Sequence, residues 1–162
     1  MCNICIIVCS VGVRSLGYLN WTCANVLESS GDTYSNYGAK AFKNYIEEIN
    51  GIHNKSFFSY CSVGYTSGSK DMKNTIEQLI SNMNPAGCAC KVNVVFAQHA
   101  DLAQLFLEAD NKGYKGEWVV GDTLLGSLAD MARKVKQELQ QNNKKDSSVD
   151  EILRGMFKIM RK

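Results

Sequence analysis

The stretch that decides the fold reads NVLESSGDTYSNYGAKAFKNYIEEING and runs from Asn25 to Gly51. Its first part is apolar, and a short segment rich in serine, glycine and aspartate separates it from a second part with helical spacing. A strand that leads into a helix through a polar loop has this pattern. In an open parallel sheet, ligands bind at the loops where strands end. The stretch therefore predicts a strand, a candidate binding loop and a helix.

The rest of the chain repeats this alternation. Strands are expected at residues 21–27, 55–63, 91–97 and 117–122. Helices are expected at residues 35–49, 67–83, 100–114, 127–141 and 148–160. Within the first helix, either Tyr37 or Gly38 joins Ala41, Phe42, Tyr45 and Ile49 on the apolar face. The third helix is expected to end at Gly113, and its apolar stripe is formed by Leu102, Leu105, Phe106 and Ala109. This order predicts one three-layer α/β/α sandwich with a mainly parallel sheet and right-handed crossovers.

Length and composition are those of one globular domain. The chain has 162 residues, of which 45% are hydrophobic, and a formal net charge of +2 that is too small to indicate nucleic-acid binding. Residues 1–19 form an apolar segment that is either a ragged start or signal-like, and residues 20–162 form the domain. The apolar segment falls short of the roughly 20 residues that cross a bilayer, so no transmembrane helix is expected.

The seven cysteines leave two interpretations open. Cys23 and Cys61 fall in expected strands, where a free cysteine is most often a core side chain. A disulfide involving Cys61, Cys88 or Cys90 instead requires an oxidising compartment. Cys88 and Cys90 form a C-x-C pair that no neighbouring pair or histidine completes to four ligands, so no metal site is predicted.

Three loops follow the carboxyl ends of expected strands, at residues 28–34, 98–100 and 121–124. Because such ends meet at one edge of a parallel sheet, we expect the loops to converge. Asp32 and Asp122 could accept hydrogen bonds from an amine, and Tyr34 offers a flat ring. Alternatively, Asp32 and Ser35 only cap the helix that follows.

Catalytic patterns are lacking. His53 lies in a turn where a solvated side chain is expected, and His99 follows a strand without a recognisable catalytic partner. Neither of the two common glycine-rich phosphate-loop patterns occurs, and TSGS at residues 66–69 is the closest candidate. The sequence therefore predicts a binding protein rather than an enzyme, and no cofactor.

Several motifs resemble a receptor family. The stretch NWTCANVLESSGDTYSNYGAKAF, from Asn20 to Phe42, is similar to the opening of the second lobe in ligand-binding regions of the atrial-natriuretic-factor-receptor type. Those regions have the type I periplasmic-binding-protein fold. The run CKVNVVFAQHADLAQLFLEADNKGYKGEWVVGD, at residues 90–122, and EILRGMFKIMRK, at residues 151–162, resemble later parts of the same lobe.

The resemblance implies a function and a site. It implies a non-catalytic, extracellular or membrane-associated recognition lobe for a small polar, amino-acid-like ligand, which signals when the cleft between two lobes closes. The first lobe of the domain is expected to be missing, and any membrane attachment to lie in absent segments. By position in the family pattern, the implied ligand-binding residues are Tyr34 and Asp122, with Ser29, Ser30 and Gln98 at the rim.

Two other functions compete with the receptor lobe. A small enzyme or signalling domain of flavodoxin-like or response-regulator-like topology has the same order of elements. A response regulator, however, needs an aspartate after its third strand, where this chain has Gln98 and His99. An interaction module that forms a homodimer through an apolar helix face could use Met156, Phe157 and Ile159.

Overall fold

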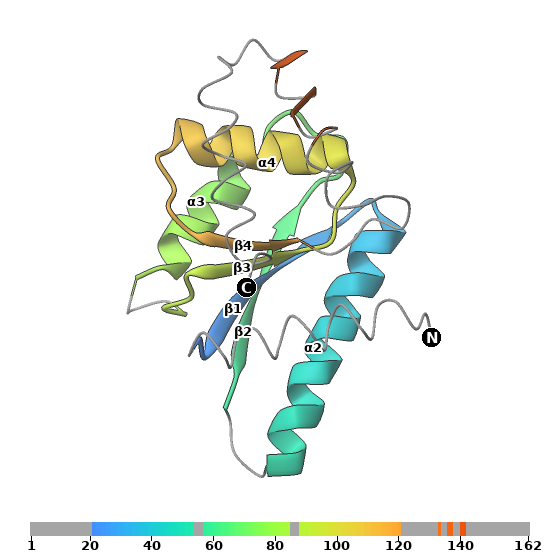
Figure 1. Cartoon of the computed structure of the whole chain (residues 1–162), viewed down its shortest axis with the longest axis vertical. Helices are drawn as coiled ribbons and strands as arrows, with labels where there is room; N and C mark the ends of the chain where they lie inside the picture. Colours follow the sequence, from blue (N-terminus) through green and yellow to red (C-terminus); the bar gives the residue numbers. More distant parts are fainter. Residues whose placement is uncertain are drawn as a thin grey trace.

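The computed structural model describes residues 21–53, 57–84 and 88–120, together with residues 133, 136, 137, 140 and 141. Its elements are β1 (Cys23–Ser29), α2 (Thr33–His53), β2 (Ser59–Tyr65), α3 (Lys73–Asn82), β3 (Val92–Val95), α4 (His99–Asn111) and β4 (Glu117–Val120). All three strand pairs are parallel. The predicted α/β/α sandwich is thereby confirmed (Figure 1). The helices expected after residue 126 and the loop at 121–124 lie outside the described residues, apart from a few isolated helical positions.

The strand order is β2-β1-β3-β4, which reverses direction between β1 and β3. From β1 the chain crosses to β2 on one side, and it then returns past β1 to place β3 on the other side (Figure 1). Residues Leu27, Val63 and Val95 are aligned across these three strands. The carboxyl ends of β1 and β3 therefore flank a topological switch point, which is where open α/β sheets bind ligands.

Two apolar clusters cover the two faces of the sheet. Helix α2 covers one face, and α3 and α4 cover the other (Figure 1). The cluster under α2 is formed by Ala24, Val26, Ala39, Phe42, Ile46, Val92, Val94 and Phe96. The largest buried side chains of the cluster under α3 and α4 are Leu27, Met72, Ile76, Leu79, Leu102, Leu105 and Phe106. Because strand side chains alternate between faces, the continuous apolar strands supply both clusters.

The inward face of α2 contains Gly38 rather than Tyr37. Tyr37 is 68% exposed, whereas a Cβ atom at Gly38 would lie 2.3 Å from Cγ of Phe96. Helix α2 therefore approaches the segment after β3 so closely that only glycine fits without a shift of the ring. Of the other expected positions, Phe42 is buried, and Ala41, Tyr45 and Ile49 are half-buried.

Helix α4 follows its sequence pattern closely. Leu102, Leu105, Phe106 and Ala109 are all buried, as the spacing predicts. The helix stops at Gly113, whose φ of 64° lies in the left-handed region. The N–H of Gly113 donates to the carbonyl of Asp110 (3.0 Å), and the N–H of Tyr114 donates to that of Ala109 (2.8 Å). This pair of bonds is a Schellman C-cap, and it confirms the glycine stop.

The first two strands begin later than predicted. Strand β1 starts at Cys23 rather than at residue 21, and β2 starts at Ser59 rather than at residue 55. Before β2, the side chain of Asn50 takes the place of a neighbouring strand. Its Oδ1 accepts from the N–H groups of Phe57 and Phe58, and its Nδ2 donates to the carbonyl of Phe58. These backbone groups are satisfied without sheet pairing, so the strand ladder does not extend to them.

Candidate functional site

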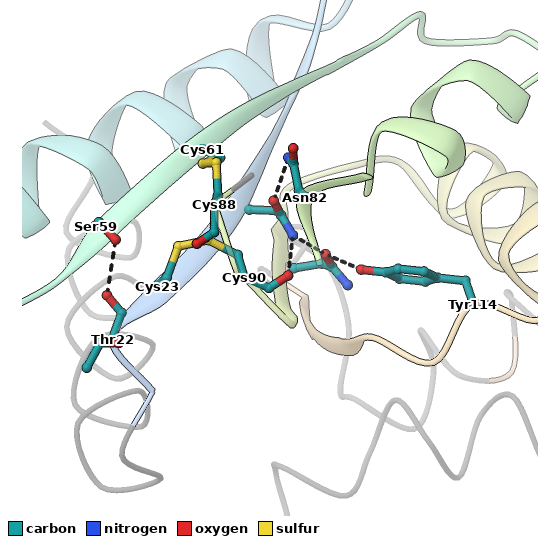
Figure 2. Close-up of a disulfide and its surroundings, with 10 residues drawn as sticks. Thr22, Cys23, Ser59, Cys61, Asn82, Cys88, Cys90 and Tyr114 are labelled. Carbon is teal, nitrogen blue, oxygen red and sulfur yellow. Dashed lines mark hydrogen bonds between the residues drawn. A yellow bond between two sulfur atoms is a disulfide. The ribbon is translucent and has the colours of Figure 1, made fainter. Parts of the chain in front are cut away.

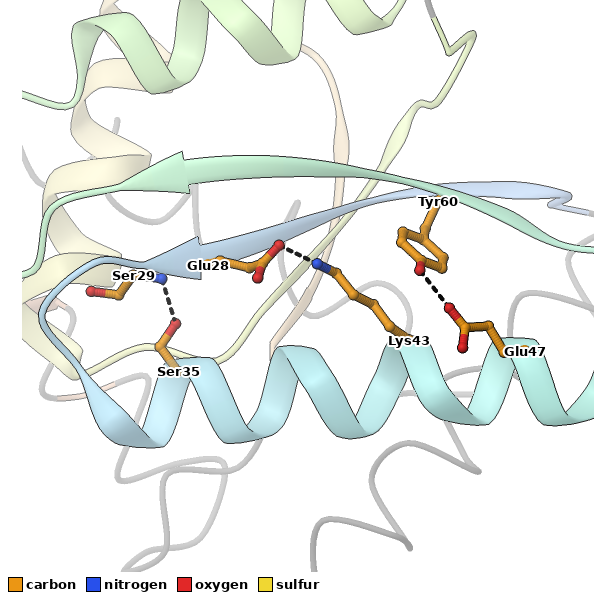
Figure 3. Close-up of polar contacts among 6 residues, drawn as sticks. All are labelled: Glu28, Ser29, Ser35, Lys43, Glu47 and Tyr60. Carbon is orange, nitrogen blue, oxygen red and sulfur yellow. Dashed lines mark hydrogen bonds and ion pairs between the residues drawn. The ribbon is translucent and has the colours of Figure 1, made fainter.

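The loop between β1 and α2 is folded tightly onto the sheet. The N–H of Ser29 donates to Oγ of Ser35 (3.1 Å), and the N–H of Gly31 donates to Oγ of Ser29 (3.2 Å) (Figure 3). The N–H of Ser30 donates to the carbonyl of Tyr65 at the end of β2 (3.0 Å). The ends of β1 and β2 are thus joined, as parallel pairing predicts. The prediction that Ser35 caps the helix is wrong, because its hydroxyl instead accepts from the end of β1.

Asp32 caps helix α2 with only one of its carboxylate oxygens. Oδ1 accepts from the N–H of Tyr34 (3.0 Å), and the carbonyl of Asp32 accepts the first helical bond, from Asn36 (3.1 Å). Oδ2 is buried, and no hydrogen-bond partner for it is found among the residues that the structure describes. A buried, unpartnered carboxylate oxygen is costly, which makes this atom a candidate ligand contact. The capping interpretation is therefore correct for Asp32 but leaves half of its carboxylate unused.

Tyr34 lies at the boundary between core and solvent. Its half-buried ring packs edge-to-face on Phe96, with centroids 6.5 Å apart and an interplanar angle of 72°. Phe96 follows β3, so this contact joins the β1 loop to the β3 loop across the switch point. Of the three loops expected to converge, the one at residues 28–34 therefore lies against the segment that leads from β3 into the loop at 98–100, while the loop at 121–124 lies outside the described residues.

Tyr65, at the end of β2, contacts the same edge of the sheet through its hydroxyl. Its hydroxyl lies 3.2 Å from Oγ of Ser35 and 3.4 Å from the carbonyl oxygen of Phe96, within reach of both loops. Burial raises the pKa of Tyr65 to about 12, and the negative charges of Asp101 and Asp32 act in the same direction. The hydroxyl therefore stays protonated at neutral pH and acts as a structural donor.

The TSGS turn after β2 binds a carboxylate of the chain itself. Oγ of Ser67 donates to Oδ2 of Asp101 (2.6 Å), and the N–H of Gly68 donates to Oδ1 (2.7 Å). Asp101 lies in the first turn of α4 and is only 3% exposed. Because Asp101 occupies these donors, the turn is not free to cradle a phosphate. This arrangement argues against the flavodoxin-like alternative, which relied on this segment.

The other predicted binding residues have different environments. Ser29 is 2% exposed with its hydroxyl bonded internally, so it is not at the rim, whereas Ser30 and Gln98 are exposed. Gln98 is the N-cap residue of α4, without a side-chain capping bond. Asp122 lies outside the described residues. The structure therefore brings Tyr34 and Ser30 together at one edge, with Gln98 following β3.

A row of charged side chains runs along α2 below this edge (Figure 3). Lys43 forms an ion pair with Glu28 of β1, and its Nζ lies 5.5 Å from the ring centroid of Tyr60. The hydroxyl of Tyr60 donates to Oε1 of Glu47 (2.7 Å). Burial acts to raise the pKa of Glu28, but bonds from Lys43 and Ser62 outweigh it and hold that pKa below its usual value. These contacts join α2 to the sheet and need no ligand.

Four cysteines gather at the opposite, amino end of the sheet. Disulfides join Cys23 to Cys90 and Cys61 to Cys88 (Figure 2). The expectation that Cys23 and Cys61 are free core thiols is therefore wrong. The alternative of a disulfide involving Cys61, Cys88 or Cys90 is confirmed, and the pairing also includes Cys23. Cys23 begins β1, Cys61 lies within β2, and the C-x-C pair lies just before β3.

A buried network of amides lies beside the disulfides (Figure 2). Nδ2 of Asn25 donates to the carbonyl of Cys90 (3.2 Å) and to Oδ1 of Asn93 (3.0 Å), while its Oδ1 accepts from Asn82 (2.9 Å). Oδ1 of Asn93 also accepts from the hydroxyl of Tyr114 (2.9 Å), and its Nδ2 donates to the carbonyl of Glu117 (3.1 Å). Both asparagines are fully buried and fully bonded, as buried amides must be.

Comparisons with known proteins do not place the chain in a family. No protein-family model matches the sequence, and a search of the curated proteins finds no similar sequence. Within the described residues, no helix is both long enough and apolar enough to span a bilayer.

Proposed function

We propose that the chain is a ligand-recognition lobe of a receptor-like binding domain, and that its ligand is a small, polar, amino-acid-like molecule. In the intact protein, the ligand would be held between this lobe and a second one, and closure of the two lobes would transmit the signal. The resemblance of residues 20–42 to receptor ligand-binding regions suggests this function. The arrangement of the carboxyl edge supports it independently.

The observation that carries the proposal is the carboxylate of Asp32. Its Oδ2 has no partner among the described residues, and it lies two residues before Tyr34, at the switch point of the sheet. An ammonium group would supply the missing hydrogen bond and a compensating charge. The half-buried ring of Tyr34 would cover the apolar part of such a ligand. Asp32 therefore replaces Ser29 in the site, beside Tyr34, Ser30 and Gln98.

The experiment is a titration of the full chain with free L-amino acids, followed by amide chemical shifts in NMR. We expect weak, millimolar binding, because a single lobe supplies only part of the contacts. Shifts should concentrate at Ser30, Asp32, Tyr34 and Gln98. Asp32→Asn should weaken binding at least about tenfold, the cost of one charge-assisted bond, and should leave the cap intact.

Matched variants separate the site from general effects. Glu48→Gln removes an exposed carboxylate farther along α2 and should leave the affinity unchanged. Tyr34→Ala should weaken binding through loss of the ring. The proposal fails if no amino acid shifts these amides, or if Asp32→Asn and Tyr34→Ala both bind as the unmodified chain does.

A further inference from the structure

The sulfur atoms at the amino end of the sheet form a compact group whose geometry suits a metal ion. We propose that Cys23, Cys61, Cys88 and Cys90 bind one Zn²⁺ as a tetrathiolate site when the two disulfides are reduced. This site lies at the end of the sheet opposite to the proposed ligand edge. The inference therefore goes beyond the proposed function and does not depend on it.

The first support for the zinc site is the spacing of the sulfur atoms. The Sγ atoms of Cys23, Cys61 and Cys90 all lie within 4.8 Å of one another, and Cys88 is bonded to Cys61. Zinc binds thiolates at about 2.3 Å, so a tetrahedral site places its sulfurs about 3.8 Å apart. The sulfur of Cys61 thus lies at most 4.8 Å from those of Cys23 and Cys90, within about 1 Å of this spacing. After reduction, the sulfurs within each bonded pair must separate, and Cys88 must turn toward the other three.

The backbone around the cysteines is fixed by bonds other than the disulfides. Cys23 and Cys61 lie in paired strands, so the sheet itself sets their separation. The N–H of Cys90 donates to the carbonyl of Asn82 (3.1 Å), and the carbonyl of Cys90 accepts from Asn25. These bonds do not involve the sulfurs and remain after reduction, so the backbone at Cys23, Cys61 and Cys90 stays preorganised. A preorganised set of ligands avoids much of the ordering cost of metal binding.

The C-x-C turn places its two sulfurs on the same side. Ala89 has a φ of 54°, in the left-handed region that non-glycine residues rarely adopt. Such a conformation persists only where the surroundings impose it, and it is common at functional sites. Here it lets Cys88 reach Cys61 while Cys90 reaches Cys23.

Formation of the zinc site from the two disulfides requires a reductant and one metal ion. A dithiol gives each disulfide two electrons and two protons and is itself oxidised to a disulfide. A phosphine gives only the electron pair, while one water molecule supplies the two protons and the oxygen of the resulting phosphine oxide. Either reaction breaks the S–S bond and gives two thiols. Zn²⁺ then displaces the four thiol protons into solvent and forms four Zn–S bonds. Thiolates prefer soft and borderline metals, so Zn²⁺ binds here whereas Mg²⁺ and Ca²⁺ do not. Cys23 and Cys61 are only half-buried, which leaves the ion a route of entry.

The test uses the full chain, reduced with a phosphine under nitrogen and titrated with Co²⁺ and then Zn²⁺. We expect one equivalent of Co²⁺ to give the visible bands and sulfur-to-metal charge transfer of a tetrahedral tetrathiolate, and Zn²⁺ to displace it. The oxidised chain should bind neither ion. Cys61→Ser should weaken binding about 100-fold or more. The variant with Cys2, Cys5 and Cys9 all changed to serine is the matched control and should bind as tightly as the unmodified chain.

A second measurement does not depend on whether the serine variant folds. X-ray absorption of the Zn²⁺-loaded, unmodified chain should show four sulfur neighbours at about 2.3 Å. A shell of mixed nitrogen, oxygen and sulfur ligands would overturn the proposal. Loss of binding in the Cys2, Cys5 and Cys9 variant would overturn it as well, as would unchanged binding in Cys61→Ser. Failure of the reduced chain to bind one equivalent, whether folded or not, would also count against it.

Discussion

The two ends of the sheet differ in how completely their polar and reactive groups are satisfied. At the amino end, two disulfides and the Asn25–Asn93 network leave no amide of either asparagine unbonded. At the carboxyl end, Asp32 keeps a buried oxygen without a partner among the described residues, and Ser30 is exposed. Stability concentrated at one end allows the other to tolerate an unsatisfied group, as recognition sites commonly do.

Removal of the cross-links at the amino end should have the largest effect on the free energy of unfolding. The Cys23–Cys90 disulfide spans 67 residues and the Cys61–Cys88 disulfide spans 27. Chain entropy predicts a loss of about 4 kcal/mol for Cys23→Ala/Cys90→Ala and about 3.5 kcal/mol for Cys61→Ala/Cys88→Ala. Urea unfolding of the two double variants measures both.

A third double variant, Cys23→Ala/Cys88→Ala, removes one cysteine from each disulfide and so checks the pairing. If it loses no more unfolding free energy than either matched double variant, the assigned connectivity is incorrect. Such a variant leaves two unmatched cysteines, Cys61 and Cys90, and should be less stable than either matched double variant.

The amide network should give the next largest effect. Asn93→Ala leaves the buried hydroxyl of Tyr114 and one amide hydrogen of Asn25 without their acceptor, and should cost about 2–4 kcal/mol in unfolding free energy. Tyr114→Phe is the matched control, because Asn93 Oδ1 keeps its bond from Asn25. This variant should cost only about 1 kcal/mol. Equal losses in the two variants would show that the bond between Asn25 and Asn93 adds nothing to stability beyond the bond from Tyr114.

At the carboxyl end, Gly38 offers a sharper test of packing. Gly38→Ala places a methyl group against the Phe96 ring and should destabilise the chain by about 1–2 kcal/mol, despite the better helix propensity of alanine. Gly51 lies in the same helix with nothing within 4 Å of its would-be Cβ. Gly51→Ala should therefore stabilise the chain by up to about 1 kcal/mol. Opposite signs of the change in unfolding free energy for the two variants, measured by urea unfolding, would confirm the close approach of Gly38 to Phe96.

Two tyrosines, one toward each end of the sheet, should lower the free energy of unfolding at alkaline pH. Burial raises the pKa of Tyr65 and that of Tyr114 to about 12, whereas an unfolded tyrosine titrates near about 10. Above about pH 10 the unfolded chain releases protons that the native chain keeps, so the free energy of unfolding falls as pH rises toward about 12. Near pH 11 the loss should be roughly 1 kcal/mol or less for each tyrosine, allowing for solvent access.

Phenylalanine variants measure this smallest effect. In Tyr65→Phe and Tyr114→Phe, the alkaline fall in the urea midpoint should be shallower than in the unmodified chain, because one titrating group is gone. Tyr37 is the control, since it is 68% exposed, and Tyr37→Phe should change the slope less. If neither Tyr65→Phe nor Tyr114→Phe makes the alkaline fall in the urea midpoint shallower, these tyrosines do not cause the loss of stability.

The order of elements could be predicted from the sequence because periodicity reports burial directly. The stripe of α4 and its stop at Gly113 are examples, since each depends on local spacing alone. The starts of the strands could not be predicted as well. Asn50 satisfies the backbone at Phe58 with its side chain, and no local pattern reveals such a substitution.

The candidate site could be predicted only in part. The convergence of the β1 and β3 loops follows from parallel topology, which the alternation of elements already indicates. The burial of Ser29 could not be foreseen, because it depends on how the loop folds so that Ser35, six residues later, accepts from the N–H of Ser29. The pairing of the cysteines could not be foreseen for a similar reason, since it depends on the register that places Cys61 beside Asn25.

The connectivity of the cross-links also has a consequence for biosynthesis. Both amino-terminal partners, Cys23 and Cys61, are synthesised before Cys88 and Cys90. Until then, the only cysteines they can pair with in the nascent chain are each other and Cys2, Cys5 and Cys9, none of which is the partner of either one in the structure. Correct maturation therefore requires either that oxidation waits until residue 90 has emerged or that an isomerase exchanges a premature bond.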